Sequence, residues 1–230
     1  MKLDIFIKGE LIDLCVPTPE FAQNSNWYSW FNDLQITRFL EQGLFPNTPQ
    51  QQIEFLTNNP HRLILIVAHQ QTYFGVVSLS SINFMKRTAE IAMALDKKLV
   101  KKYDRLFAIE AIARITEHGF ATLGLQRISA GQHILLSGWQ QRMELVGYRL
   151  EGIKRFGFTK GAERVDSMWI AATVEDYQKL VKLRGGSLWD SARKMAKRFQ
   201  KLPKQSLLPE LQEFQKTKGE KYYQKIFELQ

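Results

Sequence analysis

The segment RLILIVAHQQTYFGVVSLSSINFMKRTAEIAMAL, residues 62–95, decides the fold of this 230-residue chain. It contains three runs rich in Val, Ile, Leu and Ala, at residues 62–69, 73–81 and 87–95, and Gln70-Gln71 separates the first two. Apolar runs of this length, bounded by polar turn residues, are typical of β-strands. We therefore predict three consecutive strands that pair as an antiparallel meander.

Helical patterns flank the three strands on both sides. Downstream, Asp104–Leu123 carries an apolar stripe at helical spacing and ends at Gly124, a residue type that often follows a helix C-terminus. Upstream, Thr48-Pro49 supplies an N-cap and a first-turn proline for a helix that ends at Asn58. The other predicted elements are a strand at 10–16, short helices within 21–40, strands at 127–131, 148–158 and 164–171, and helices at 135–146 and 173–181.

This order of elements predicts an α/β fold, more closely an α+β arrangement in which helices cover both faces of one mixed sheet. The meander supplies antiparallel pairs. A helix that crosses between two buried strands implies that those two strands are parallel. We therefore expect a sheet that contains both kinds of pairing.

The C-terminal part of the chain differs in charge from the rest. Residues 184–230 contain 11 Lys and Arg against 5 Asp and Glu, within a chain of net charge +9. Gly185-Gly186-Ser187 predicts a hinge and a helix N-cap, followed by an apolar stripe with a basic opposite face. We predict a domain at 1–183 and a basic amphipathic helical extension at 184–230. Its helices are expected to pack on the domain or to form a homo-oligomer, and the alternative is that residues 187–204 bind nucleic acid or a membrane surface.

Several classes of protein are excluded by composition. The single cysteine, Cys15, precludes an internal disulfide and fits a reducing compartment. Clusters of His, Cys, Asp or Glu with metal-ligand spacing are absent, so no metal site is expected. The N-terminus lacks the shape of a signal peptide, and no window approaches the ~18 apolar residues of a membrane-spanning helix. We expect a soluble, cytoplasmic protein.

Several segments resemble sequences that the GNAT N-acetyltransferases carry in the same order. They are Gly75–Ile82, Thr88–Met93, Glu110-Ala111, His118–Ile128, and Gly147–Arg155 with Gly161 and Asp166. The last of these is similar to the ribosomal-protein alanine acetyltransferase branch, which includes some sugar-nucleotide amine acetyltransferases. The resemblance covers about residues 1–180 and implies a GNAT-like acyl-CoA N-acyltransferase fold, here followed by a C-terminal helical extension.

The resemblance also implies that acetyl-CoA is the co-substrate. The family polarises the thioester with strand main chain, which corresponds here to Ile91, Ala92 and Met93. The expected coenzyme-binding residues at the start of the long helix are Lys101, Lys102, Arg105, Leu106, Phe107 and Ala108. Three positions depart from the family pattern. Tyr103 stands where Gln or Arg is expected, Leu106 replaces a loop glycine, and Met143 replaces a tyrosine that can protonate the leaving thiolate.

Candidate catalytic and acceptor-binding residues lie in that strand and in other parts of the chain. Glu90 shares one face of its strand with two alanines, which leave room for a base or a water relay, although a salt-bridged carboxylate is the alternative. His133 follows the fifth family strand and is a second catalytic candidate, with a loop histidine as the alternative. Trp27, Trp30 and Phe31 are candidates for the acceptor pocket, although their helical spacing is also typical of core packing.

Taken together, these features predict an acyl-CoA-dependent N-acyltransferase. It is expected to acetylate a primary amine of a sugar nucleotide or another small molecule, with a protein N-terminus as the second choice of acceptor. The competing class is a GNAT-like domain that has lost coenzyme binding and acts as a binding or assembly module. The substitutions at Leu106 and Met143 keep that alternative open.

Overall fold

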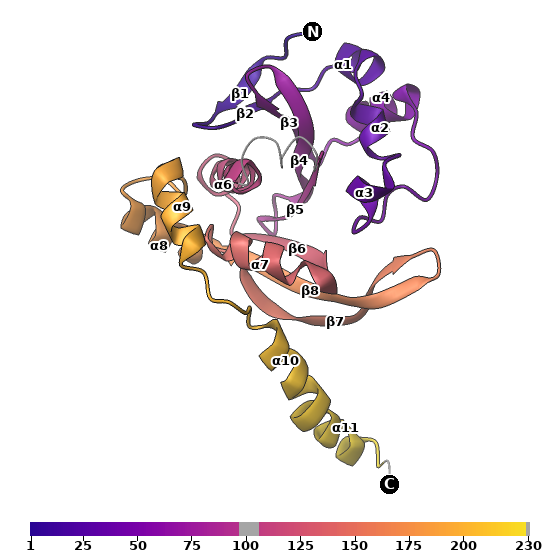
Figure 1. Cartoon of the computed structure of the whole chain (residues 1–230), viewed down its shortest axis with the longest axis vertical. Coiled ribbons are helices and arrows are strands. Elements are labelled where there is room, and N and C mark those ends of the chain that lie inside the picture. The colour runs from indigo at the N-terminus through magenta and orange to yellow at the C-terminus, as the bar shows by residue number, and fades with distance from the viewer. Residues whose placement is uncertain (97–105, 229–230) are drawn as a thin grey trace.

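A computed structural model describes residues 1–96 and 106–228, and its centre is one eight-stranded mixed sheet (Figure 1). The strands are β1 (Ile5–Lys8), β2 (Asp13–Cys15), β3 (Leu63–His69), β4 (Thr72–Asn83), β5 (Thr88–Leu95), β6 (Arg127–His133), β7 (Arg149–Lys160) and β8 (Glu163–Thr173). Their order in the sheet is β1-β2-β3-β4-β5-β6-β8-β7. Among the described strands, β5 and β6 pair in parallel, and the other neighbours pair antiparallel.

Helices cover both faces of the sheet, as Figure 1 shows. The helices before the meander are α1 (Pro19–Asn24), α2 (Trp27–Trp30), α3 (Leu34–Thr37) and α4 (Pro49–Thr57). Those that follow it are α6 (Leu106–Ala121), α7 (Ser137–Glu144), α8 (Val174–Arg184), α9 (Ala192–Gln200), α10 (Leu208–Phe214) and α11 (Glu220–Ile226), with a 3₁₀ turn η1 (Ile134–Leu136) and a π turn η2 (Gln215–Gly219).

Alternation along the central strands divides the buried residues into two cores. On β3, Leu65 and Val67 pack beneath α6, whereas Ile64 and Ile66 pack beneath α1, α2 and α4. Successive strand side chains point to opposite faces, so a strand buried on both faces needs apolar residues throughout. This is the physical reason why the run at 62–69 is almost uninterrupted Leu, Ile and Val.

Glu110 ties the first hairpin to the long helix α6. Its carboxylate is fully buried and accepts hydrogen bonds from the backbone N–H groups of Glu10 (2.6 Å), Leu11 (2.7 Å) and Ile12 (3.3 Å). Arg114, one turn along the helix, forms an ion pair with it at 3.0 Å. A buried carboxylate is stable only when its oxygens are paired in this way.

The predicted fold class is confirmed, and the antiparallel meander lies where the sequence placed it. The N-terminal prediction is corrected, because residues 10–16 are not one strand. The chain forms β1 at Ile5–Lys8, turns through residues 9–12 and returns as β2 at Asp13–Cys15. Strand β6 also runs two residues past its predicted end, to His133.

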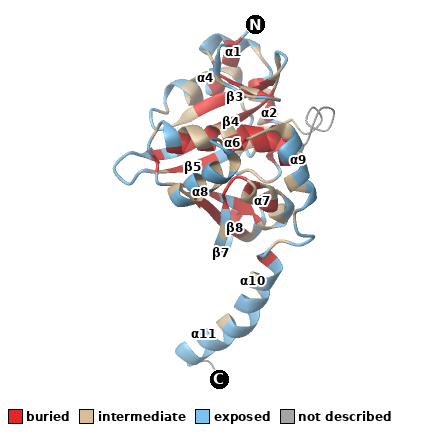
Figure 2. Ribbon diagram, turned by 90° about the vertical axis from the view of Figure 1, so that its left-hand side faces the viewer, coloured by how far each residue is buried: buried red, intermediate tan, exposed pale blue. Residues whose placement is uncertain are grey.

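The segment after Arg184 has two structurally different parts. Leu188, Trp189 and Met195 are buried in the same core as α6, and Glu10 accepts a hydrogen bond from Trp189 Nε1 at 2.7 Å. By contrast, α10 and α11 extend away from the sheet in Figure 1, and their surface is mostly exposed in Figure 2. The helix predicted to begin at Ser187 begins instead at Ala192, with Ser191 as its N-cap.

None of the helices in the described residues is both long and apolar enough to cross a membrane. The same residues contain no group of three or more His, Cys, Asp or Glu side chains arranged to hold a metal ion.

Candidate functional site

The parallel strands β5 and β6 stay together for three residue pairs and then separate. The pairs are Thr88 with Arg127, Ala89 with Ile128, and Glu90 with Ser129. Beyond this point β5 remains paired with β4, and β6 remains paired with β8. The sheet therefore opens into a gap whose two edges are strand main chain.

The edge formed by β5 contains the residues expected to polarise a carbonyl group. The peptide groups of Ile91–Leu95 have no strand partner on the β6 side of the described structure. Such peptide groups are strong hydrogen-bonding groups that require water or a ligand. Ile91 is buried, Met93 is half-buried and Ala92 is exposed, so the edge is open at Ala92.

Glu90 stands at the mouth of this gap, on the face covered by α1–α4. Ala89 and Ile91 pack beneath α6, and Ala94 packs beneath the opposite helices. The alternation therefore places Glu90 and Ala92 on the same face as Ala94. The carboxylate is exposed, as a base that exchanges protons with solvent requires.

Arg62 is the cation whose charge interacts with Glu90. Burial lowers the pKa of Arg62, and the Glu90 carboxylate acts in the opposite direction. The guanidinium also lies over the ring of Phe55, 4.8 Å from its centroid. Arg62 thus lies between the two, with a charge interaction to Glu90 and a cation–π contact to Phe55 of α4.

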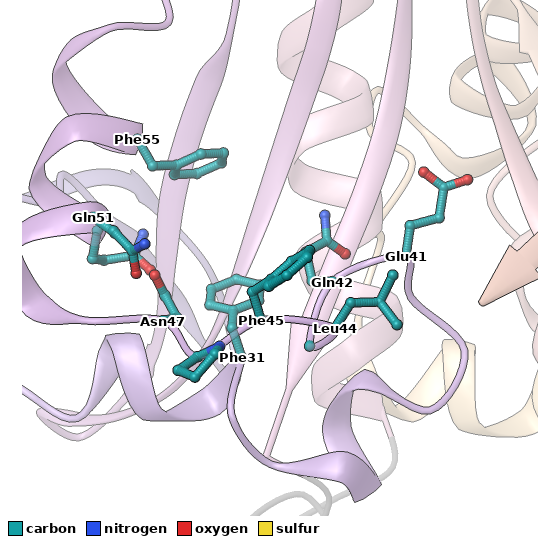
Figure 3. Close-up of a pocket in the computed structure, with 11 residues that line it drawn as sticks. Phe31, Glu41, Gln42, Leu44, Phe45, Asn47, Gln51 and Phe55 are labelled. Atoms are coloured by element: carbon teal, nitrogen blue, oxygen red, sulfur yellow. The ribbon is translucent and has the colours of Figure 1, made fainter. Parts of the chain in front are cut away.

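A hollow of about 400 Å³ opens beside α4 (Figure 3). Phe31 follows α2, α4 contributes Gln51, Gln52 and Phe55, and the loop 41–47 supplies the remaining wall. The full lining is Phe31, Glu41, Gln42, Gly43, Leu44, Phe45, Pro46, Asn47, Gln51, Gln52 and Phe55. Of the three predicted acceptor residues, it contains Phe31.

A second, smaller hollow of about 60 Å³ reaches β5. It shares Phe31, Gln42 and Phe55 with the first, and its floor includes Ala92, Met93 and Ala94. The two hollows are therefore adjacent, and the inner one lies against the open edge of β5. This arrangement places an apolar binding surface next to the predicted carbonyl-polarising strand.

The structure separates the three predicted acceptor residues. Phe31 lines both hollows. Trp27 is 0% exposed and Trp30 8% exposed, and both pack in the core beneath α1, α2 and α4. Their apolar surface is already used for packing, so they support the wall instead of forming it.

Lys160 holds the loop that forms the hollow. From the tip of the β7–β8 hairpin, its ammonium donates hydrogen bonds to the carbonyl oxygens of Thr37 and Gln42, each at 2.6 Å. Burial lowers the pKa of Lys160. The β7–β8 hairpin therefore contacts the loop that lines the larger hollow.

His133 is buried and does not fit the catalytic role expected for it. Its ring packs against Phe39 and Phe158, each with a centroid distance of 4.7 Å. The backbone N–H of Leu135 donates to Nδ1, so the ring proton lies on Nε2, which faces Glu163 Oε1 at 3.1 Å. The side chain is 2% exposed, because it joins β6, β7 and the residues after α3.

Met143 and its neighbours supply no evident proton donor for a leaving group. Gln132 directs its amide nitrogen to the Met143 sulfur at 2.8 Å, and both side chains are buried. Tyr148 is also buried; burial raises the pKa of its hydroxyl, which is hydrogen-bonded to Thr116 at 2.8 Å. Among the described residues, neither Met143 nor Tyr148 is therefore an accessible proton source for the thiolate.

The expected coenzyme-binding residues lie partly outside the described structure. Lys101, Lys102 and Arg105 are among the residues that it does not describe. Leu106, Phe107 and Ala108 form the first described turn of α6 and are buried. The Leu106 side chain packs in the main core, so it is directed toward the sheet.

Several residues of the site were not singled out from the sequence. They are Arg62, Phe45, Phe55 and Gln52. Phe45 belongs to the loop 41–47, Gln52 and Phe55 belong to α4, and Arg62 directly precedes β3, so these residues come together only through tertiary packing, which no local pattern encodes. The one available signal was composition, because Leu44-Phe45-Pro46 is an apolar run without helical or strand periodicity.

Comparison with known proteins adds independent information. Residues 17–148, more than half of the chain, match the family described as "Acetyltransferase (GNAT) domain". Among curated protein sequences, none matches the chain significantly.

Solved structures with a similar fold include three that contain a coenzyme. Spermidine N-acetyltransferase from Vibrio cholerae, with CoA and spermine, has a TM-score of 0.65 at 17% identity, covering 73% of this chain and 98% of that chain. RimJ from Mycobacterium smegmatis, with CoA-disulfide, gives 0.64 at 15% identity and covers 75% and 88%. The microcin C7 self-immunity acetyltransferase MccE, with acetyl-CoA and AMP, gives 0.62 at 18% identity and covers 72% and 93%. At sequence identities of 15–18%, this similarity shows a shared fold and nothing more.

Proposed function

We propose that this chain, which belongs to the GNAT acetyltransferase family, transfers an acetyl group from acetyl-CoA to a primary amine of a small molecule. The observation that carries the proposal is the separation of β5 and β6 after Glu90 and Ser129. It leaves the peptide groups of Ile91–Leu95 that face β6 without a strand partner, so that they can pair with an amide-containing arm such as pantetheine. It also leaves donors in place for the thioester oxygen, which becomes more negative as the amine attacks.

In the proposed reaction, the amine nitrogen forms a bond to the thioester carbonyl carbon. The carbon–sulfur bond then breaks, and the CoA thiolate leaves with the electron pair. Glu90 accepts the proton that the ammonium must lose, directly or through water, and solvent protonates the thiolate. Most of the rate enhancement is expected from holding the two substrates together.

The acceptor is expected to approach from the face covered by α1–α4. Both hollows open on that face, and the inner one touches Ala92. Amine acetylation is also the activity named for the Vibrio cholerae protein of similar fold, which supports an amine acceptor here. A sugar nucleotide, which the sequence resemblance favours, and a protein N-terminus remain candidate acceptors.

Substitution in the gap tests the proposal. Ala92 is exposed and has a small side chain at the inner hollow, so Ala92→Phe should fill the space that the substrates need. We expect acetyl-CoA-dependent release of CoA thiol in the presence of an amine panel to fall at least about tenfold. Ala121→Phe, at an equally exposed alanine at the end of α6, is the matched control. Equal activity in the two variants would contradict the proposed location.

Two observations favour the non-catalytic alternative: Leu106 stands where the family has a loop glycine, and the buried thioether of Met143 stands where the family has a tyrosine. A binding or assembly module would show neither thiol release nor saturable coenzyme binding. The proposed enzyme would still show saturable coenzyme binding even if none of the amines tested were its acceptor. Coenzyme binding therefore separates the two functions.

A further inference from the structure

The larger hollow has an aromatic wall with little charge. Phe31, Phe45 and Phe55 contribute three rings, and Leu44 and Pro46 add aliphatic surface. Phe45 is 84% exposed, although a large apolar side chain normally gains free energy by leaving water. An apolar ligand placed against the loop 41–47 would cover this ring.

Gln52 adds a hydrogen-bond donor whose orientation is determined by its neighbours. Asn47 donates from Nδ2 to the Tyr28 carbonyl oxygen at 3.3 Å and to Gln52 Oε1 at 2.9 Å. The Tyr28 carbonyl can only accept, so Asn47 must present its NH₂ group there. Gln52 consequently turns its oxygen toward Asn47 and its Nε2 group away.

The Nε2 group of Gln52 is buried and has no hydrogen-bond partner among the described residues. The residue as a whole is 2% exposed and lines the hollow. A buried donor without a partner is costly, and most native proteins avoid it. A ligand in the hollow that carries an oxygen acceptor would remove this cost.

The charges of the lining disfavour two other kinds of acceptor. Glu41 is the one acidic residue among the described residues that line the larger hollow, whereas a polyamine needs several carboxylates. The described lining of the larger hollow contains no Lys or Arg to pair with the pyrophosphate of a sugar nucleotide, and Arg62, which lines the inner hollow, lies over the ring of Phe55. Rings and amides therefore dominate recognition.

We propose that the acceptor is an uncharged aromatic scaffold that carries a primary amine and a nearby carbonyl oxygen. The ring packs among Phe31, Phe45 and Phe55, the carbonyl oxygen accepts from Gln52 Nε2, and the amine is directed to the inner hollow at Ala92. This inference rests on the proposed function, since it names the substrate class of the same site. A free aromatic amino-acid amide and an aromatic N-terminal residue of a peptide share this chemistry.

Four amines test the inference with the full-length protein and acetyl-CoA. Phenylalaninamide has the ring and the carbonyl, phenethylamine lacks the carbonyl, glycinamide lacks the ring, and spermidine is a polycation. We expect kcat/KM for phenylalaninamide to exceed that for phenethylamine and glycinamide by about tenfold or more, with spermidine lowest. A short peptide that begins with Phe, compared with phenylalaninamide, distinguishes a peptide N-terminus from a free amino-acid amide as the acceptor. Equal or better use of spermidine or glycinamide would overturn the inference.

Two variants assign the preference to named side chains. Phe45→Ala should reduce the advantage of phenylalaninamide over glycinamide, and Phe84→Ala, at another exposed phenylalanine, is the control. Gln52→Leu should reduce the advantage of phenylalaninamide over phenethylamine. If Gln52→Leu lowers the melting temperature sharply, the exposed Phe45 carries the test alone. If Phe45→Ala keeps the full preference for phenylalaninamide over glycinamide, Phe45 does not contact the ring of the acceptor.

Calorimetry with phenylalaninamide, with CoA present, separates failure of the inference from failure of the proposed function. Binding without acetylation would contradict the proposed function and support the assigned ligand class. Acetylation of spermidine without binding of phenylalaninamide would support the function and overturn the inference. If phenylalaninamide is neither bound nor acetylated, the inference is overturned directly.

Discussion

Glu90 of β5 and Ser129 of β6 are the last residues that pair across the parallel strands before the sheet opens. Each strand continues beyond this pair alongside a different neighbour, β5 with β4 and β6 with β8. The opening therefore follows from strand pairing and does not depend on any one side chain. A carboxylate at its mouth is exposed to solvent and lies on the same strand face as Ala92.

Replacing Glu90 tests its assignment as the base. Glu90→Gln keeps the size of the side chain but cannot accept the proton from the ammonium. We expect kcat to fall about 100-fold and the rate to respond differently to pH, while the thermal stability stays the same. Glu54→Gln, at an exposed glutamate of α4, is the isosteric control. Identical rates for Glu90→Gln and the unmodified protein at every pH would remove Glu90 as the base.

Lys160 is expected to act on substrate binding through the loop that forms the hollow. Lys160→Met removes the donors that hold the carbonyl oxygens of Thr37 and Gln42. Because this lysine touches the loop and not the reacting atoms, we expect KM for the amine to rise about fivefold with kcat nearly unchanged. Lys154→Met, at an exposed lysine of the same hairpin, should leave both constants unchanged. A fall in kcat alone would argue against a positioning role.

The ion pair between Asp190 and Arg198 makes a contribution to the free energy of unfolding that depends on pH. Arg198 donates hydrogen bonds of 2.6 and 2.7 Å to this carboxylate and lowers its pKa from 3.8 to about 2. The folded pKa is the lower one, so the stabilisation is present above about pH 4 and is lost as the pH falls through 2.

Urea unfolding of Asp190→Asn checks this dependence. We expect the free energy of unfolding to fall by about 2 kcal/mol at pH 7, and the difference from the unmodified protein to be about half as large at pH 3. Lys194→Met is the control, because Lys194 lies 3.6 Å from Asp190 and its side chain is 63% exposed; its effect should stay below about 1 kcal/mol. A difference of the same size at both pH values would contradict the assignment.

Two shortened chains test the division at residue 184. A chain that ends at residue 183 loses the buried side chains of Leu188, Trp189 and Met195, each of which should cost about 2–5 kcal/mol. We expect this chain to unfold or aggregate. A chain that ends at residue 206 removes the projecting helices and, with them, one buried side chain, Leu208, so its melting temperature should fall much less than that of the shorter chain. Equal stability of both shortened chains would show that residues 188–195 add nothing to the core.

The same pair of chains tests whether the projecting helices form the predicted homo-oligomer. Phe214, Tyr222 and Ile226 are each more than half exposed on α10 and α11. Two copies packed antiparallel would bring Glu210 and Glu213 of one helix near Lys221 and Lys225 of the other, which is a self-complementary arrangement. We expect light scattering to show a dimer for the full chain and a monomer for the chain ending at residue 206. Equal masses would contradict the proposal.

The sequence predicted the central part of the fold well because its signals are local. The runs at 62–69 and 73–81 are long and apolar enough to be strands in any context. By contrast, β1 was missed because Ile5 and Phe6 are exposed on an edge strand of four residues, without the alternation of a half-buried strand. The start of α9 was misplaced because Ser187 looks like an N-cap locally, whereas its hydroxyl donates to Glu117 at 2.9 Å.

The candidate site was predictable only in part for the same reason. Glu90 was recognisable, because a carboxylate in an apolar strand beside alanines is unusual. The orientation of Gln52 depends on Asn47 and Tyr28, which belong to different elements. Burial of Trp27 and His133 likewise results from packing between segments far apart in the chain. Such contacts are properties of the tertiary structure and leave no periodic signal.

Coenzyme binding tests the central claim most directly. Isothermal titration of acetyl-CoA into the full-length protein needs no knowledge of the acceptor amine. If the gap between β5 and β6 holds the pantetheine arm, the titration will show saturable binding with one site per chain, and Ala92→Phe will weaken it while Ala121→Phe will not. Absence of saturable binding at millimolar acetyl-CoA would contradict the enzyme proposal and favour a non-catalytic role for this fold.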